Sequence, residues 1–121
     1  MPTIRKRHIL GIILVLSCHS IKAQSILIDS LKLILSKETT PVENRIRATA
    51  QLGRIIANKD LKTAIGMEQQ ALVMSNGLKD TQYKSFVYAC LVHLYTLADS
   101  IRLAGKAADS AVFYANNNIA K

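Results

Sequence analysis

Apolar residues recur at steps of three and four along the chain from residue 26 onward. Such steps place side chains on one face of a helix, whereas a half-buried strand would alternate apolar and polar positions. Five segments show the helical pattern, and residues that break or cap helices separate them. These segments are 26–37, 41–57, 61–75, 81–95 and 100–115. Sustained alternation occurs in none of them, so the sequence predicts an all-α fold.

Polar residues, proline and glycine mark the expected helix ends. Thr40 is expected to cap the second helix with Pro41 as its first residue, where the fixed φ of proline is tolerated. Asp60 is expected to cap the third helix, and Gly77 to adopt the left-handed conformation after its last turn. The last two helices are expected to start at Asp80 or Thr81 and at Asp99 or Ser100.

The second and third helices form one expected antiparallel hairpin, and the fourth and fifth form another. Three pairs of residues correspond between them: Leu52 with Leu91, Ala64 with Ala104, and Ala71 with Ala111. Their spacing is nearly constant, at about 40 residues, which indicates duplication of one supersecondary unit. Gly53 costs about 1 kcal/mol against alanine inside a helix, so we expect a second helix to pack closely there.

The motif Tyr88-x-x-Leu91-Val92-x-x-Tyr95 and the two alanines that follow it resemble the tetratricopeptide repeat family. The first hairpin keeps Leu52-Gly53 and its own two alanines. Several positions depart from the family pattern: Thr49 and Ile56 replace aromatic residues of the first helix, Glu68 and Ala108 replace the aromatic residue of the second, and no proline closes either unit. The resemblance covers about 46–115 and implies a short α-solenoid, with repeats over 42–80 and 81–121 after a leading helix and linker over 24–41.

The resemblance also implies a partner-binding site, because such repeats bind proteins or peptides on the concave face lined by each first helix. The residues carried over by position are Arg47, Ala50, Arg54, Asn58, Phe86, Ala89, His93 and Thr96. Two guanidinium groups seven residues apart share a helix face and could bind a carboxylate or an acidic peptide. The alternative interpretation is an ordinary solvated helix face.

The first residues have the order of a secretory signal peptide, here assigned to 1–23. Arg5-Lys6-Arg7 precedes the apolar run 9–16, and cleavage is expected after Ala23. This apolar run has eight residues, whereas a membrane-spanning helix needs about twenty. Alternatively, residues 14–18 resemble a bacterial lipobox, in which Cys18 would be acylated. Either interpretation predicts an exported protein, periplasmic or otherwise extracytoplasmic and membrane-associated.

The formal net charge of +8 is concentrated at the start of the chain. Residues 1–23 hold four basic and no acidic residues, and the remainder holds 12 basic and 8 acidic residues without a basic block or an aromatic platform. This distribution argues against a nucleic-acid partner. After processing at Ala23, Cys90 is the sole cysteine, so no internal disulfide is expected, and its neighbours predict a buried apolar role.

The sequence offers little for catalysis. It has no Gly-rich phosphate loop and no metal-spaced cysteine or histidine cluster, and His93 is the lone histidine after the leader. Glu68 and Asp109 lie inside expected helices, and we interpret both as parts of solvated faces. We therefore expect no enzymatic activity, cofactor or metal within this chain.

A signal peptide, a short helix and such repeats resemble the sensory N-terminal part of bacterial membrane-bound two-component regulators. A histidine kinase output domain would belong only to a longer parent protein. The last expected helix carries Val112, Phe113 and Tyr114 with nothing after it to cover them. We therefore expect either a fragment of a longer sensor or scaffold, or self-association through this helix. The alternatives are a lipoprotein scaffold acylated at Cys18 and a basic helical nucleic-acid binder.

Overall fold

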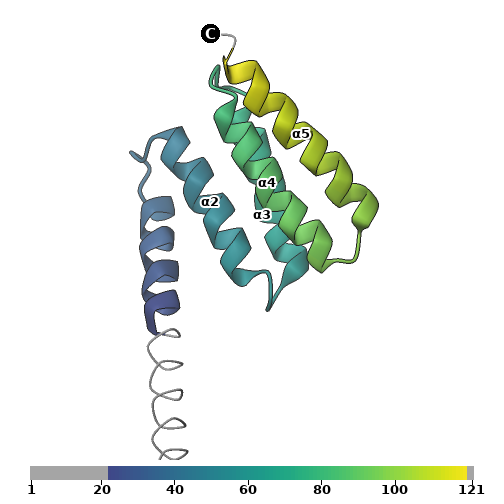
Figure 1. Cartoon of the computed structure of the whole chain (residues 1–121). Helices are drawn as coiled ribbons and strands as arrows, with labels where there is room; N and C mark the ends of the chain where they lie inside the picture. The colour runs from purple at the N-terminus through teal and green to yellow at the C-terminus, as the bar shows by residue number, and fades with distance from the viewer. Residues whose placement is uncertain (1–21, 120–121) are drawn as a thin grey trace, which may run out of the picture. The chain divides into compact units, whose positions relative to one another are not determined.

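A computed structural model describes residues 22–119 of the chain, and all its regular structure in that range is helical (Figure 1). The helices are 22–36, α2 Val42–Ile56, α3 Leu61–Ser75, α4 Gln82–Leu97 and α5 Ile101–Ile119. Each expected helix is present and no strand occurs between residues 22 and 119, so the all-α prediction is confirmed. The residues that carry the signal-peptide and Cys18 interpretations, up to residue 21, lie outside the described range.

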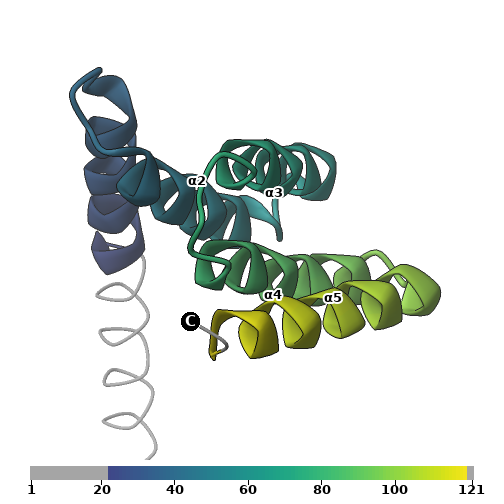
Figure 2. The same cartoon turned by 90° about the horizontal axis from the view of Figure 1, so that it is seen from above.

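The chain divides into two compact units, residues 1–30 and 31–121, and the helix 22–36 crosses the boundary. Within the second unit, α2 packs on α3 and α4, α3 packs on α4, and α4 packs on α5. The labelled helices therefore pack on neighbours in chain order, as Figures 1 and 2 show. Corresponding helices start at equal intervals: α2 and α4 begin at Val42 and Gln82, and α3 and α5 begin at Leu61 and Ile101.

Small and aliphatic side chains fill the core between these helices, as the composition predicts. One buried cluster joins α2, α3 and α4 and consists of Ile46, Ala50, Ala71, Val87 and Cys90. A second cluster, towards the other end of the helices, contains Ala57, Ala64 and Leu94. Alanine at the helix crossings leaves room for Ile46 and Leu94 alongside, and both are completely buried.

Gly53 marks the closest approach between α2 and α3. A Cβ atom at this position would lie 2.8 Å from Oε1 of Glu68 and 3.2 Å from the carbonyl oxygen of Ala64. Both distances are shorter than ordinary van der Waals contact, so a side chain here would push the helices apart. The close packing expected at Gly53 is confirmed, and its physical reason is the presence of α3 directly against the α2 backbone.

Of the expected N-caps, Asp60 is confirmed, Asp80 is confirmed in part, and Thr40 is wrong. Asp60 accepts a hydrogen bond from the Thr63 amide at 3.0 Å and caps α3. Asp80 accepts one from the Gln82 amide at the start of α4. Thr40 does not cap α2: its hydroxyl donates to the Ile34 carbonyl instead, and α2 starts after Pro41 without a side-chain cap.

The left-handed turn residue is Asp99, not Gly77. Gly77 has no positive φ, whereas Asp99 has a φ of 55°. The amides of Asp99 and Ser100 donate to the carbonyls of Thr96 and Tyr95, which is the Schellman arrangement at the end of α4. The sequence predicts the special backbone at the glycine because glycine tolerates it best, but here the tight turn between α4 and α5 requires it at an aspartate.

This assignment predicts whether each of two substitutions raises or lowers the free energy of unfolding. Asp99→Gly removes a Cβ from a left-handed residue and should raise the free energy of unfolding by about 0.5–1 kcal/mol. Gly77→Ala should also raise it, by about 0.4–1 kcal/mol, because no heavy atom lies within 4 Å of the added Cβ. Urea unfolding measures both. A loss of stability in Gly77→Ala would indicate that Gly77 has a positive φ and would contradict the structure.

Candidate functional site

Two of the predicted partner-binding residues, Arg47 and Phe86, line one pocket between the first helices of the two hairpins. Arg47 and Gln51 contribute from α2, and Gln82, Tyr83 and Phe86 from α4. The pocket has a volume of about 270 Å³. We refer to these five residues as the α2–α4 pocket. Its wall combines a cation, two carboxamides and two aromatic rings.

The Arg47 guanidinium is positioned by an aromatic ring from the other hairpin. Its central carbon lies 5.4 Å from the centroid of the Tyr83 ring, which is within the range of a cation–π interaction. A guanidinium carries five N–H donors in a planar fork that matches the geometry of a carboxylate. The exposed Arg47 is therefore both oriented and able to donate hydrogen bonds.

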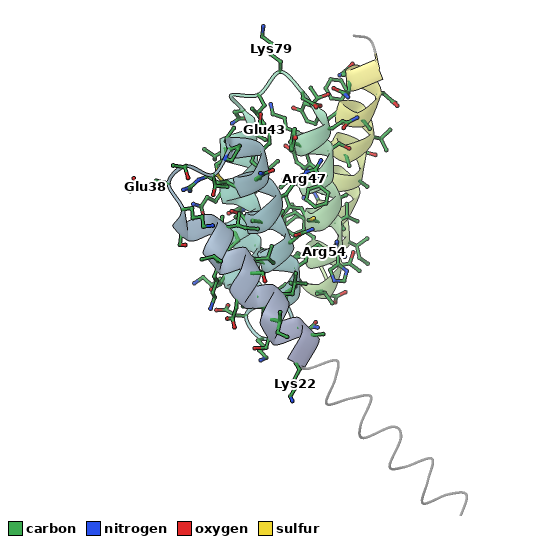
Figure 3. All side chains as sticks on the ribbon, turned by 90° about the vertical axis from the view of Figure 1, so that its left-hand side faces the viewer. Lys22, Glu38, Glu43, Arg47, Arg54 and Lys79 are labelled. Atoms are coloured by element: carbon green, nitrogen blue, oxygen red, sulfur yellow. The ribbon has the colours of Figure 1, made fainter. Side chains whose placement is uncertain are left out.

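The other predicted residues lie outside the α2–α4 pocket. Arg54 is exposed two turns along α2 from Arg47, and Figure 3 shows the two arginines on the same side of that helix. Asn58 lies in the turn after α2, and His93 is exposed on α4. Thr96 is exposed, and its hydroxyl donates to the Val92 carbonyl of its own helix.

Ala50 is wrong as a lining residue, because it is completely buried in the core, whereas Ala89 is exposed. Sequence reasoning also missed Gln51, Gln82 and Tyr83. Gln51 could have been found, since it follows Arg47 by four residues and shares its helix face. Tyr83 is half-buried and its ring carries the cation contact, which no local sequence signal indicates.

Glu68 is the largest departure from expectation at the level of a single residue. Its side chain was expected on a solvated face, but it is completely buried in α3, next to Gly53 of α2. Neither carboxyl oxygen has a hydrogen-bond partner. Burial raises the pKa of Glu68 to about 8, and the positive charge of Arg54 opposes this only in part. The carboxyl group is thus mostly protonated at neutral pH. Asp109, the other mid-helix carboxylate, is exposed as expected.

Cys90 is buried at 3% exposure, as predicted from its apolar neighbours. Burial, with a smaller effect of the Glu68 carboxylate, raises the pKa of the thiol to about 12. Since the thiolate is the reactive form of cysteine, this thiol is a packing group at neutral pH.

The described part of the chain holds neither a metal cluster nor a membrane-spanning helix. No three histidine, cysteine, aspartate or glutamate side chains between residues 22 and 118 lie close enough together to hold a metal ion. Within the same part of the chain, no helix combines the length and the apolarity needed to cross a bilayer.

No protein-family model, curated protein or solved structure matches this chain. The interpretation of the site therefore depends on its own residues and geometry.

The close approach at Gly53 predicts opposite effects for two glycine-to-alanine substitutions. Gly53→Ala should lower the free energy of unfolding by about 1–3 kcal/mol, because the added methyl meets Glu68 and the α3 backbone. Gly66→Ala is the matched control: it lies exposed in α3 with no atom near its added Cβ, and should gain about 1 kcal/mol from helix propensity. Equal effects of the two substitutions in urea unfolding would contradict the close approach.

The burial of Glu68 predicts that stability falls as pH rises. The folded pKa, about 8, lies above the ordinary value of 4.5, so the folded state binds this proton more tightly. The contribution of this proton to the free energy of unfolding is fully present below pH 4.5. It is lost as the pH rises through 8, at up to about 1.4 kcal/mol per pH unit. Glu68→Gln should abolish this slope between about pH 5 and 8, measured by urea unfolding.

The control for this pH series is Glu38→Gln, which changes an exposed carboxylate and keeps every other titrating group. It should retain the slope of the unaltered protein. A Glu68→Gln protein with the same slope as this control would show that Glu68 is ionised or solvated in the folded state.

Proposed function

We propose that this chain is a tetratricopeptide-like interaction module that binds an acidic segment of a protein or peptide partner along α2 and α4. The observation that carries the proposal is the α2–α4 pocket, where Arg47 of the first hairpin and Phe86 of the second meet. A shared pocket between equivalent helices suits a partner that extends across both hairpins.

Three features of the fold support the comparison with that family. The helices pack in chain order, equivalent helices start at equal intervals along the chain, and alanine or glycine occupies the crossings. Equivalent core positions are also buried, with Leu52 at 7% and Leu91 at 2% exposure. These features are those expected when one helical hairpin is repeated and stacked on itself.

The charge of the two first helices supports an acidic partner. Together α2 and α4 contain Arg45, Arg47, Arg54 and Lys84, and their sole acidic residue is Glu43. By contrast, α3 has one lysine and one buried glutamate, and α5 has two basic residues and one acidic residue. The positive balance is therefore larger on these two helices than on α3 and α5. Arg45 donates to the Lys37 carbonyl and Lys84 lies over the Tyr114 ring of α5, so the cation that would attract a negatively charged segment into the pocket is Arg47.

The size of the α2–α4 pocket supports a peptide over a small molecule. Its volume of about 270 Å³ is below the roughly 300–1,000 Å³ typical of small-molecule and cofactor sites. A pocket of this size holds one or two side chains. A carboxylate on Arg47 beside an apolar group on Phe86 would use both kinds of wall.

The place of the module in the cell belongs to the same proposal. The basic and apolar leader over 1–23 supports export to an extracytoplasmic compartment, with a lipid anchor at Cys18 as the alternative. A longer sensor or scaffold protein is the proposed parent. Palmitate labelling that depends on Cys18 would identify the anchored form.

The sharpest test of the pocket is Arg47→Glu. Against an array of immobilised peptides with acidic, neutral and basic sequences, the unaltered protein should prefer acidic peptides that also carry an apolar residue. Arg47→Glu should weaken binding at least tenfold, because it replaces a charge-assisted hydrogen bond by repulsion. The control is Lys62→Glu, an equal charge reversal on α3. An equal loss of peptide binding in both variants, or no preference for acidic peptides, would contradict the proposed site.

Arg54→Glu is a less specific test of the site than Arg47→Glu. Arg54 lies close enough to Glu68 to lower the pKa of that buried carboxyl group. Reversing its charge would change the environment of the core as well as the surface. A loss of binding in Arg54→Glu would therefore not distinguish a partner contact from a change in stability, whereas Arg47 packs on the half-buried Tyr83 ring at the pocket.

A further inference from the structure

One face of α5 is apolar and open to solvent. Ile101 and Val112 are 78% and 61% exposed, and between them lie Gly105, which is exposed, and Ala108, which is half-buried. The steps of four, three and four residues place all four on one side of the helix. We call these four residues the α5 face. Ala104 and Ala107, on another side of the helix, are buried.

The equivalent face of the first hairpin is a helix–helix interface. When α3 and α5 are aligned at their first residues, the α5 face corresponds to Leu61, Ile65, Glu68 and Leu72 of α3. In α3 these positions pack on neighbouring helices: Leu61 and Ile65 lie on the cluster that contains Ala57 and Leu94, and Leu72 lies on the cluster that contains Ile46 and Val87. Glu68 is buried next to Gly53 of α2. The hairpin therefore uses this face for packing another helix, and in α5 it is exposed.

We propose that the α5 face is the interface of a homodimer, in which it packs antiparallel on the same face of a second copy. In this arrangement Ile101 lies opposite Val112 of the partner subunit, and Gly105 lies opposite Ala108 of the partner subunit. Both pairs have the same midpoint, between Lys106 and Ala107. One two-fold axis therefore satisfies all the contacts, as an interface between identical copies requires.

The charges beside the α5 face fit the same register. Arg102 and Asp109 each follow a residue of the face by one position, so they flank it on the same side. In an antiparallel pair, equivalent flanks of the two helices lie next to each other. Arg102 then lies within two residues of Asp109 of the partner subunit along the axis, and symmetry repeats the ion pair. A parallel pair would place Ile101 against its own copy and lose this complementarity.

The size of the central residues favours a second α5 over another helix of the α4 type. The centre of the α3 face holds Ile65 and Glu68, whereas the centre of the α5 face holds Gly105 and Ala108. Two faces with small centres allow the backbones to approach closely while Ile101 and Val112 fill the ends. The α2–α4 pocket lies on other helices, so this inference stands independently of the peptide-binding proposal.

The test is sedimentation velocity of the full chain over roughly 5–500 μM, a range suited to a small interface. The unaltered protein should pass from monomer to dimer. Val112→Glu should raise the dissociation constant at least about a hundredfold, because each copy then buries a carboxylate against Ile101. Val73→Glu, an equal change at an exposed valine of α3, should leave the dimer intact. Association that persists unchanged in Val112→Glu, through the leader or another surface, would overturn the proposal, as would a monomer throughout.

A charge exchange tests the register. Arg102→Asp alone should weaken the dimer about tenfold, because two ion pairs become repulsive. Combining it with Asp109→Arg should restore the affinity of the unaltered protein, since the symmetric pairs are re-formed with opposite polarity. Failure of the double variant to recover would overturn the antiparallel register, and a dimer insensitive to both would place the interface elsewhere.

Discussion

The contact between the backbone of α2 at Gly53 and α3 controls the geometry of the first hairpin. Without a side chain at this position, α2 lies against the Ala64 carbonyl and the Glu68 carboxyl group. With α2 and α3 this close, α4 contacts both of them and completes the two buried clusters. The same arrangement places Arg47 of α2 beside Tyr83 of α4, so the candidate pocket depends on a contact made elsewhere on the helix.

The close packing of α2 on α3 also affects the protonation of Glu68. A charged carboxylate without hydrogen bonds is very costly to bury, so the group shifts its pKa and is held mostly neutral. The first hairpin therefore has a core whose packing is coupled to the protonation of one residue. The second hairpin has Ala108 forty positions later and lacks this coupling.

The apolar periodicity and the helix-capping and helix-breaking residues predicted the helices and most of the core, because these signals depend only on residues close together in the sequence. The Asp60 cap and the buried Cys90 follow from nearby residues alone. Contacts with other segments were not predictable in this way. Thr81 holds the expected N-cap position of α4, but its hydroxyl donates to the carbonyl of Tyr114 in α5 and its oxygen accepts no hydrogen bond from the amides that start α4. For Glu68 two local signals disagree: the family resemblance places an aromatic residue at this position, whereas a charged side chain inside a helix favours the surface.

The two hairpins share a register but differ in the residues that would meet a following helix. In α3 that face is large and packs on the two buried clusters; in α5 it is small at the centre and exposed at both ends. Tyr114 of α5 instead packs inward, stacked on Tyr88 of α4 with ring centroids 5.7 Å apart. The second hairpin is thus stabilised internally by aromatic stacking while an aliphatic face remains available. Separation of that face from the α2–α4 pocket means that self-association and peptide binding would use different helices and can be altered one at a time.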